Sequence, residues 1–242
     1  IEQLLLPVAT ITGNNTICQG SSTVLTAEGG VTYNWSPTSG LSGSTTATIT
    51  ASPVTTTTYV VTVTGQNGCK VKDSVLVNVT PRPVFSAITS KPVLCTGDTA
   101  ILLATGGDSY VWSPAGTLNA PFSNQTEAFP RTTTNYKVVI ENWQCGIKDS
   151  LFLTLPVANK PLVQTTKSND INCFLPQATL TAGGGSKYLW QPATGLSDPT
   201  SNKPIVRINK TTTFQVLITT NEGCQVEDSV TVFVNKGDDG SG

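Results

Sequence analysis

Apolar and polar residues alternate at every second position through most of the chain. The clearest apolar face starts at an aromatic residue, continues with two aliphatic ones, and occurs three times: Tyr59, Val61 and Val63; Tyr136, Val138 and Ile140; Phe214, Val216 and Ile218. A period of two is typical of a half-buried β-strand. A second face recurs in the same way: Val75, Val77 and Val79; Leu151, Leu153 and Leu155; Val230, Val232 and Val234. No segment shows a helical stripe, so the pattern predicts strands throughout.

Other landmarks repeat in the same register. The six cysteines form three pairs with separations of 51, 50 and 51 residues: Cys18 and Cys69, Cys95 and Cys145, Cys173 and Cys224. A tryptophan follows the first cysteine of each pair at one fixed offset, and a tyrosine precedes that tryptophan by two: Trp35, Trp112 and Trp190, with Tyr33, Tyr110 and Tyr188. The chain therefore contains three copies of one module.

Short strands separated by Gly, Pro and Ser turns within about 78 residues are typical of a two-sheet sandwich. The fold class that we predict is all-β, with three tandem Ig-like antiparallel β-sandwich modules in an elongated array. The predicted boundaries are 1–81, 82–156 and 157–236, with 237–242 a flexible tail or linker. Proline-containing joints at 80–83 and 156–161 predict semi-rigid connections, since proline fixes φ and removes a donor.

The amino-acid composition favours strands and argues against some kinds of partner. Threonine and valine, both β-branched, account for 40 and 24 of the 242 residues, which favours strands. The 14 basic and 15 acidic residues leave a net charge of −1, so nucleic acid is not an expected partner. No run of about 18 apolar residues exists, so we expect no membrane insertion. The chain also starts at Ile1 without methionine, which we interpret as a processed product or an excised fragment.

The sequence predicts no enzyme and no cofactor. Histidine, the commonest general base, is absent. There is also no GxSxG elbow, no glycine-rich phosphate loop after a strand, and no recurring carboxylate pair.

The cysteines predict an oxidising, extracellular location. A module of about 80 residues has only marginal stability without a cross-link. A disulfide closing a loop of about 50 residues contributes about 4 kcal/mol to stability in the chain-entropy model. We therefore expect bonds within modules, at the module edge: Cys18 with Cys69, Cys95 with Cys145, and Cys173 with Cys224. Zinc is the rejected alternative, because there is no CxxC, no histidine and no clustered third ligand.

One family resemblance covers essentially the whole chain, three times over. The run from Trp190 to Pro199, the threonine run before Phe214, the Gly223–Cys224 pair and Asp228–Ser229–Val230 resemble Ig-like, PKD-like modules of large secreted Bacteroidota surface proteins. The resemblance implies a protein of the adhesin or gliding-motility type, exported by type IX secretion. The second copy departs most, with Ala115–Gly116–Thr117–Leu118 where the other copies have Gly-Leu.

The aromatic residues suggest one contact site. The three repeated tryptophans could stack on sugars, but their fixed register favours core positions. Trp143 occurs only in the second copy, beside Cys145 in a predicted hairpin turn, and is the candidate contact residue.

A recurring Asp-Ser or Asp-Thr pair followed by an apolar residue suggests modification. It resembles the short acceptor motif of Bacteroidota O-glycosylation, which makes Ser74, Thr99, Ser150 and Ser229 candidate glycan sites. Calcium binding by Asp73, Asp149 and Asp228 is not expected, since calcium takes six to eight oxygen ligands and these carboxylates are isolated; a capping or turn role fits better.

The function that these observations favour is a non-enzymatic structural stalk or repeat segment of an extracellular bacterial surface adhesin or filament. The expected partners are neighbouring modules of the same or adjacent chains, and surface glycan or protein. Two alternatives stay open: an array that binds glycan or protein, and an accessory region of a secreted enzyme.

Overall fold

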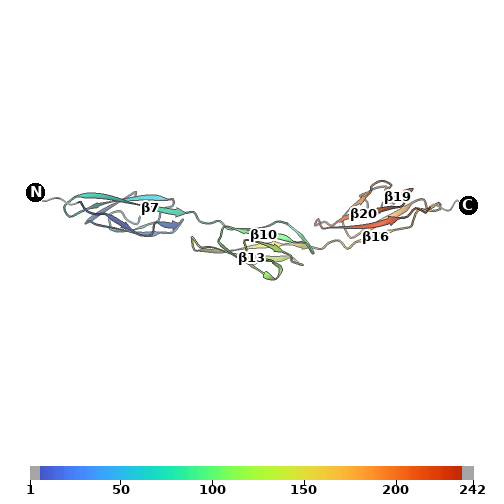
Figure 1. The fold of residues 1–242 in the computed structure, drawn as a ribbon, viewed down its shortest axis with the longest axis horizontal. Coiled ribbons are helices and arrows are strands. Elements are labelled where there is room, and N and C mark those ends of the chain that lie inside the picture. The colour runs from blue at the N-terminus through green and yellow to red at the C-terminus, as the bar shows by residue number, and fades with distance from the viewer. Residues whose placement is uncertain (1–5, 236–242) are drawn as a thin grey trace.

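The computed structural model describes residues 6–235, and strands dominate it. These residues form 21 β-strands and one short 3-10 helix, and their sheets divide into three β-sandwiches, called modules 1 to 3 in chain order. Figure 1 shows the modules in a row from the N-terminus to the C-terminus. The predicted fold class is confirmed: the chain is an elongated array of three Ig-like β-sandwiches.

Module 1 contains strands β1 to β7. One sheet has the order β1-β3-β5, and the other has the order β2-β7-β6-β4. The bounds are β1 Thr10–Thr12, β2 Thr16–Cys18, β3 Thr23–Glu28, β4 Thr32–Ser36, β5 Thr48–Ala51, β6 Thr57–Thr64 and β7 Lys70–Thr80. The pairs are antiparallel except β2 with β7, which run parallel.

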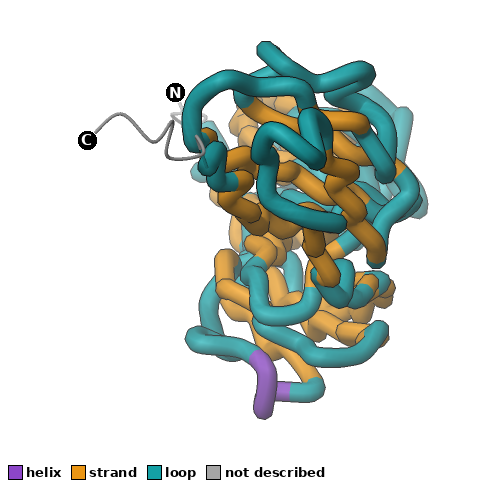
Figure 2. Tube along the Cα trace, turned by 90° about the vertical axis from the view of Figure 1, so that its right-hand side faces the viewer, coloured by secondary structure: helices purple, strands orange, loops and turns teal. Residues whose placement is uncertain are grey.

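Module 2 repeats this arrangement with sheets β12-β10-β8 and β11-β13-β14 and a short parallel pair, β15-β9. The bounds are β8 Ser86–Thr89, β9 Leu94–Cys95, β10 Ala100–Thr105, β11 Ser109–Ser113, η1 Ala115–Thr117, β12 Gln125–Ala128, β13 Thr134–Asn142, β14 Ile147–Leu155 and β15 Val157–Ala158. The 3-10 helix η1 is the purple turn in Figure 2, where the row is seen from the right-hand side of Figure 1.

Module 3 has sheets β16-β17-β19 and β18-β20-β21. The bounds are β16 Gln164–Lys167, β17 Ala178–Gly183, β18 Lys187–Gln191, β19 Ile205–Val206, β20 Thr212–Thr219 and β21 Gln225–Val232. An isolated parallel bridge from Ile171 to Val234 takes the place of the short parallel strand pair of the other modules.

The core of each module is built around its repeated tryptophan. Trp35, Trp112 and Trp190 are at most 1% exposed, and the apolar faces predicted from the alternation surround them. Each indole Nε1 donates a 3.0 Å hydrogen bond to a backbone carbonyl, of Thr46, Ser123 and Ser201 respectively. A buried indole with its one donor satisfied stabilises the core and is inaccessible to a sugar. The interpretation of these tryptophans as core residues is therefore correct.

The repeated glycine pair allows a close approach of backbones. Gly29 has φ of +101°, and a Cβ there would lie 1.8 Å from the carbonyl oxygen of Val8. Its neighbour Gly30 accepts a 2.8 Å hydrogen bond from the hydroxyl of Tyr33. Only glycine fits such a site, because any Cβ would clash with the first segment of the module.

The joints between modules follow the last long strand of each module. The predicted domain boundaries stay a prediction; β15, which lies just past residue 156, still pairs with β9 of module 2. The predicted tail at 237–242 lies outside the described residues. Among residues 6–235, no helix is long and apolar enough to cross a membrane.

Candidate functional site at the module ends

Every module has two ends, and we call the end where the chain enters proximal and the end where it leaves distal. The first cysteine of module 1 lies at the distal end. Cys18 ends β2, which pairs in parallel with the last residues of β7, so that Cys18 lies opposite Thr80. The amide of Gln19 donates a 2.9 Å hydrogen bond to the carbonyl of Thr80. Cys18 is therefore beside the point where the chain leaves for module 2.

The second cysteine of module 1 lies at the proximal end. Cys69 is in the turn between β6 and β7, immediately before the 11 residues of β7. A strand rises about 3.3 Å per residue, so Cys69 and Thr80 are separated by roughly 36 Å. A disulfide requires Cα atoms closer than about 7 Å. Cys18 and Cys69 are at opposite ends of the module and are too far apart to bond.

The cysteines bond between modules instead. Cys18 is bonded to Cys145, and Cys95 is bonded to Cys224, each with a Cα–Cα distance of 5.6 Å. Cys69 and Cys173 are free. The predicted pairing within modules, Cys18–Cys69, Cys95–Cys145 and Cys173–Cys224, is therefore wrong. The physical reason is that the first strand bearing a cysteine runs parallel to the last strand of its module, which carries that cysteine to the distal end.

Each internal junction therefore has two covalent connections, the linker and a disulfide. At the second junction the linker is also fixed by hydrogen bonds: the amide and hydroxyl of Thr96 donate to the Ala158 carbonyl at 2.9 and 3.0 Å. Sγ of Cys224 lies 3.9 Å from the same carbonyl oxygen. The disulfide and the linker thus lie side by side.

An ion pair adds to this junction. Lys160, in the linker, lies 2.7 Å from Asp98, at the distal end of module 2. The hydrogen bond from Lys160 holds the pKa of the Asp98 carboxyl below its ordinary value, and the charges of Lys160 and Lys91 act in the same direction. The carboxylate is partly exposed, so solvent screens the pair and its contribution is small.

Trp143, the predicted contact residue, lies at the first junction. It begins the turn that carries Cys145, and its amide donates a 2.8 Å hydrogen bond to Asp108 Oδ2. The indole side chain is 68% exposed. The adjacent Gln144 carbonyl oxygen is 3.7 Å from Sγ of Cys18 in module 1. Trp143 is thus an exposed aromatic next to a disulfide, and its role in contacts stays a prediction.

The four candidate glycan sites are on the surface. Ser74, Thr99 and Ser229 are exposed, and Ser150 is half-buried. The three serines follow Asp73, Asp149 and Asp228, whose Oδ1 atoms accept the serine amide at 2.8, 2.7 and 2.8 Å. These aspartates therefore act as local caps of a strand amide, which agrees with the capping role expected for them. Among the described residues, no group of three His, Cys, Asp or Glu side chains could hold a metal.

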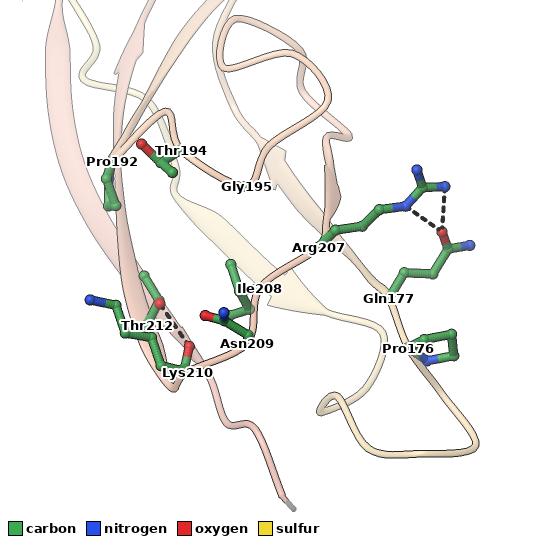
Figure 3. Close-up of a pocket in the computed structure, with 10 residues that line it drawn as sticks. All are labelled: Pro176, Gln177, Pro192, Thr194, Gly195, Arg207, Ile208, Asn209, Lys210 and Thr212. Carbon is green, nitrogen blue, oxygen red and sulfur yellow. Dashed lines mark hydrogen bonds between the residues drawn. The ribbon is translucent and has the colours of Figure 1, made fainter.

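A hollow lies at the distal end of module 3. Figure 3 shows it between the loop that carries Pro176 and Gln177, the loop from Pro192 to Gly195, and the segment from Arg207 to Thr212. Its cavity volume is about 870 Å³, and none of the described residues that line it is aromatic. The guanidinium of Arg207 donates through Nε and Nη2 to Gln177 Oε1, at 3.3 and 3.1 Å. The sequence reasoning missed this hollow, because its residues come from three loops without a shared motif.

One substitution between the copies distinguishes this end of module 3. In module 1 the hydroxyl of Tyr59 donates to the Ser39 carbonyl at 2.8 Å, and in module 2 the hydroxyl of Tyr136 bonds Thr117 at 2.7 Å. Burial raises the pKa of both phenols. Phe214 occupies the equivalent position in module 3 and has no hydroxyl. The loop from Pro192 to Gly195 therefore lacks the hydrogen bond to the core that holds its counterparts.

Comparison with known proteins gives one family match, in module 1. Residues 7–83 match the family model described as Ig-like domain, CHU_C associated. No curated protein matches the chain. Among solved structures, extracellular domains 3–5 of Drosophila OTK share 11% identity over 91% of this chain and 93% of theirs, with a TM-score of 0.43. Murine CEACAM1b shares 13% identity over 62% of this chain and 100% of its own, with a TM-score of 0.33. Both TM-scores are below 0.5.

Proposed function

We propose that the chain is a non-enzymatic structural segment of an extracellular bacterial surface adhesin or filament, a stalk that projects and spaces other parts. One observation carries the proposal: both junctions between described modules have a disulfide beside the linker. Disulfides persist in oxidising compartments, which supports an extracellular location. A second covalent connection at each joint resists separation of the modules under tension, which is the load that a surface stalk bears.

The disulfides limit how far the chain can be stretched. With both bonds intact, the shortest covalent path from Leu6 to Asn235 has three parts: 12 residues to Cys18, 50 from Cys145 back to Cys95, and 11 from Cys224. At about 3.5 Å per extended residue these 73 residues reach about 260 Å. After reduction the path is the full 229 residues, or about 800 Å.

Single-molecule stretching of the chain, held at its two ends, tests the proposal. We expect a maximal extension of about 260 Å under oxidising conditions and of about 800 Å in reductant, by the path lengths above. Two double variants serve as matched controls, Cys18→Ser with Cys145→Ser and Cys95→Ser with Cys224→Ser. Each leaves one bond and a path of about 100 residues, so each should stop at about 350 Å. An oxidised wild-type chain that extends as far as the reduced one would refute the reinforced stalk.

A second candidate function, binding of a glycan or protein, is favoured by the hollow in module 3. Its volume of about 870 Å³ is within the range of ligand sites. Arg207 and Lys210 give it positive charge, which suits an acidic saccharide or peptide. The exposed aromatic Trp143 lies at the first junction, in another module, so the two features do not form one site.

NMR titration with acidic oligosaccharides tests this second function. Saturable shifts confined to the hollow, abolished by Arg207→Ala and kept in Trp143→Ala, would support binding there. Unchanged spectra at millimolar saccharide would contradict the hypothesis of saccharide binding at the hollow. That result would not affect the stalk proposal.

A further inference from the structure

The two free cysteines lie at the two outer ends of the row of modules. Cys69 is at the proximal end of module 1, in the turn before β7. Cys173 is at the distal end of module 3, two residues after Ile171, which bridges in parallel to Val234, two residues past the end of β21. Cys18 is placed in the same way beside β7. Cys173 thus occupies the distal position and Cys69 the proximal position whose counterparts are joined by disulfides at both internal junctions.

The turn that holds Cys69 matches the turn of a bonded cysteine. The Gly65 amide donates to the Cys69 carbonyl at 2.9 Å, as the Thr220 amide donates to the Cys224 carbonyl at 2.8 Å. The preceding glycines, Gly68 and Gly223, both have positive φ, +78° and +87°. Cys224, which is bonded, is fully buried, whereas Cys69 is half-buried. The turn at Cys69 therefore has the backbone geometry of the turn at Cys224, which forms a disulfide with a cysteine at the distal end of the preceding module.

The surface around Cys173 gives a second, independent sign of a partner. Phe174 is 92% exposed and Leu175 is 48% exposed, where the other modules have Gln19–Gly20 and Thr96–Gly97. Asn172 Oδ1 accepts the amides of Phe174 and Leu175, both at 2.9 Å, which fixes the loop. Asp170, two residues before Asn172, is held too, because it pairs with Lys167 and accepts the amide of Phe233 at 2.9 Å. An exposed cysteine thus lies beside an ordered apolar pair at the outer end of the row.

We propose that Cys173 of one copy of this chain forms a disulfide with Cys69 of a second copy placed end to end. The bond repeats the internal pattern, in which the first cysteine of one module joins the second cysteine of the next. This inference rests on the stalk function and extends it: the chain is a unit of a covalent, head-to-tail filament. The two thiols lose two protons and two electrons, which a disulfide oxidant such as oxidised glutathione takes up as it becomes two thiols.

The two free cysteines of one chain cannot bond to each other. The last long strands of the three modules have 11, 9 and 8 residues, or about 36, 30 and 26 Å at about 3.3 Å per residue, so cysteines at opposite ends of the row are on the order of 90 Å apart. A bond between these two thiols within one chain is therefore excluded, and the polarity of pairing between copies can be tested with single variants.

Two variants separate the possible pairings. Cys69→Ser keeps only the distal thiol, and Cys173→Ser keeps only the proximal one. Each variant alone, and an equal mixture of the two, is incubated with oxidised glutathione and analysed by non-reducing electrophoresis and peptide mapping. Circular dichroism and small-angle scattering of each variant check that the rod is intact, which is expected because neither cysteine is bonded in the chain.

Random collision of equally reactive thiols would give twice as much mixed dimer as either homodimer. We expect at least a tenfold excess of the mixed dimer with a Cys69–Cys173 linked peptide, and a ladder of oligomers from the wild-type chain. Homodimers at the random ratio, or a wild-type chain that stays monomeric in oxidant, would overturn the proposal. The stretching experiment would be unaffected by that result, because it depends only on the internal bonds.

Discussion

Trp35 and Cys18 belong to the same module but show two different ways of holding the molecule together. Trp35 is buried among residues of its own module, and its counterparts Trp112 and Trp190 make the same hydrogen bond in theirs. Cys18 makes its bond to the next module, and the carbonyl oxygen beside the bonded sulfur differs between the junctions: Gln144 lies near Cys18 at the first, and Ala158 lies near Cys224 at the second. The interior is thus a repeated, self-sufficient core, whereas the junction depends on a neighbour.

The disulfides still affect module stability, although they lie outside the cores. While module 1 is folded, Cys18 is held beside Thr80, so the bond to Cys145 closes a loop of about 65 residues in module 2. Closing such a loop removes about 4 kcal/mol of denatured-state entropy in the chain-entropy model, before strain is subtracted. Each junction disulfide therefore stabilises a module mainly by restricting the unfolded chain.

The largest expected effect is at the core. Replacing Trp190 by Ala removes a fully buried indole and leaves a cavity, so module 3 should lose about 3–5 kcal/mol of unfolding free energy. Hydrogen exchange followed module by module measures it. The matched control is Trp143→Ala, whose side chain is exposed and which should change stability by less than about 0.5 kcal/mol. Equal losses of unfolding free energy in the two variants would contradict the conclusion that the buried tryptophans, and not the exposed one at the junction, hold the module cores together.

The next effect is at a junction. The double variant Cys18→Ser with Cys145→Ser should lower the unfolding free energy of module 2 by up to about 4 kcal/mol, while module 3, which keeps Cys95–Cys224, stays unchanged. Urea titration with a probe in each module measures both. A simultaneous loss in module 3 would mean that the junctions are not independent.

A smaller effect tests the difference between modules 2 and 3. Tyr136→Phe gives module 2 the residue that module 3 already has, and it removes the 2.7 Å bond to Thr117. One hydrogen bond contributes about 1 kcal/mol, and the loop at residues 115–118 should exchange its amides faster. Thr117→Ala is the control, and it should give a similar loss by removing the other partner. A Tyr136→Phe variant with unchanged exchange would show that this hydroxyl does not hold the loop.

The smallest effect is at the ion pair of the second junction. Asp98 has a lowered pKa in the folded chain, so its stabilising pair with Lys160 is present above about pH 4, the ordinary range of an aspartate, and is lost as the pH falls through the folded pKa. Lys160→Ala should raise the pKa of Asp98 toward its ordinary value, measured by carboxyl NMR titration. Lys91→Ala, which removes a cation 3.9 Å away, should raise it less. Equal shifts would contradict the dominance of Lys160.

The alternation of apolar residues was enough to predict the strands and the cores. Tyr59, Val61 and Val63 all lie where the period of two places them, because side chains on one face of a strand must share an environment. The exposed position of Trp143 also agrees with its place in a predicted turn.

The cysteine pairing could not be predicted from spacing alone. The separations of 50 and 51 residues within modules are as regular as those of 127 and 129 between them, so spacing does not choose between the two patterns. The direction of the short strand that ends at Cys18 determines which cysteine it can reach. Its parallel pairing with β7 is set by tertiary packing, which spacing along the chain does not reveal. The hollow in module 3 was missed for a similar reason, since its three loops meet only in the folded module.

The spacing of 127 residues between Cys18 and Cys145 also orders events in time. In a chain that leaves the ribosome or a secretion pore with its N-terminus first, Cys18 emerges long before Cys145 and waits while module 1 folds. Its bond can close only after the turn of module 2 that carries Cys145 has emerged. The first cysteine of each module is therefore oxidised only after the next module has emerged. Until then, the most recently completed module carries a reduced thiol at its distal end.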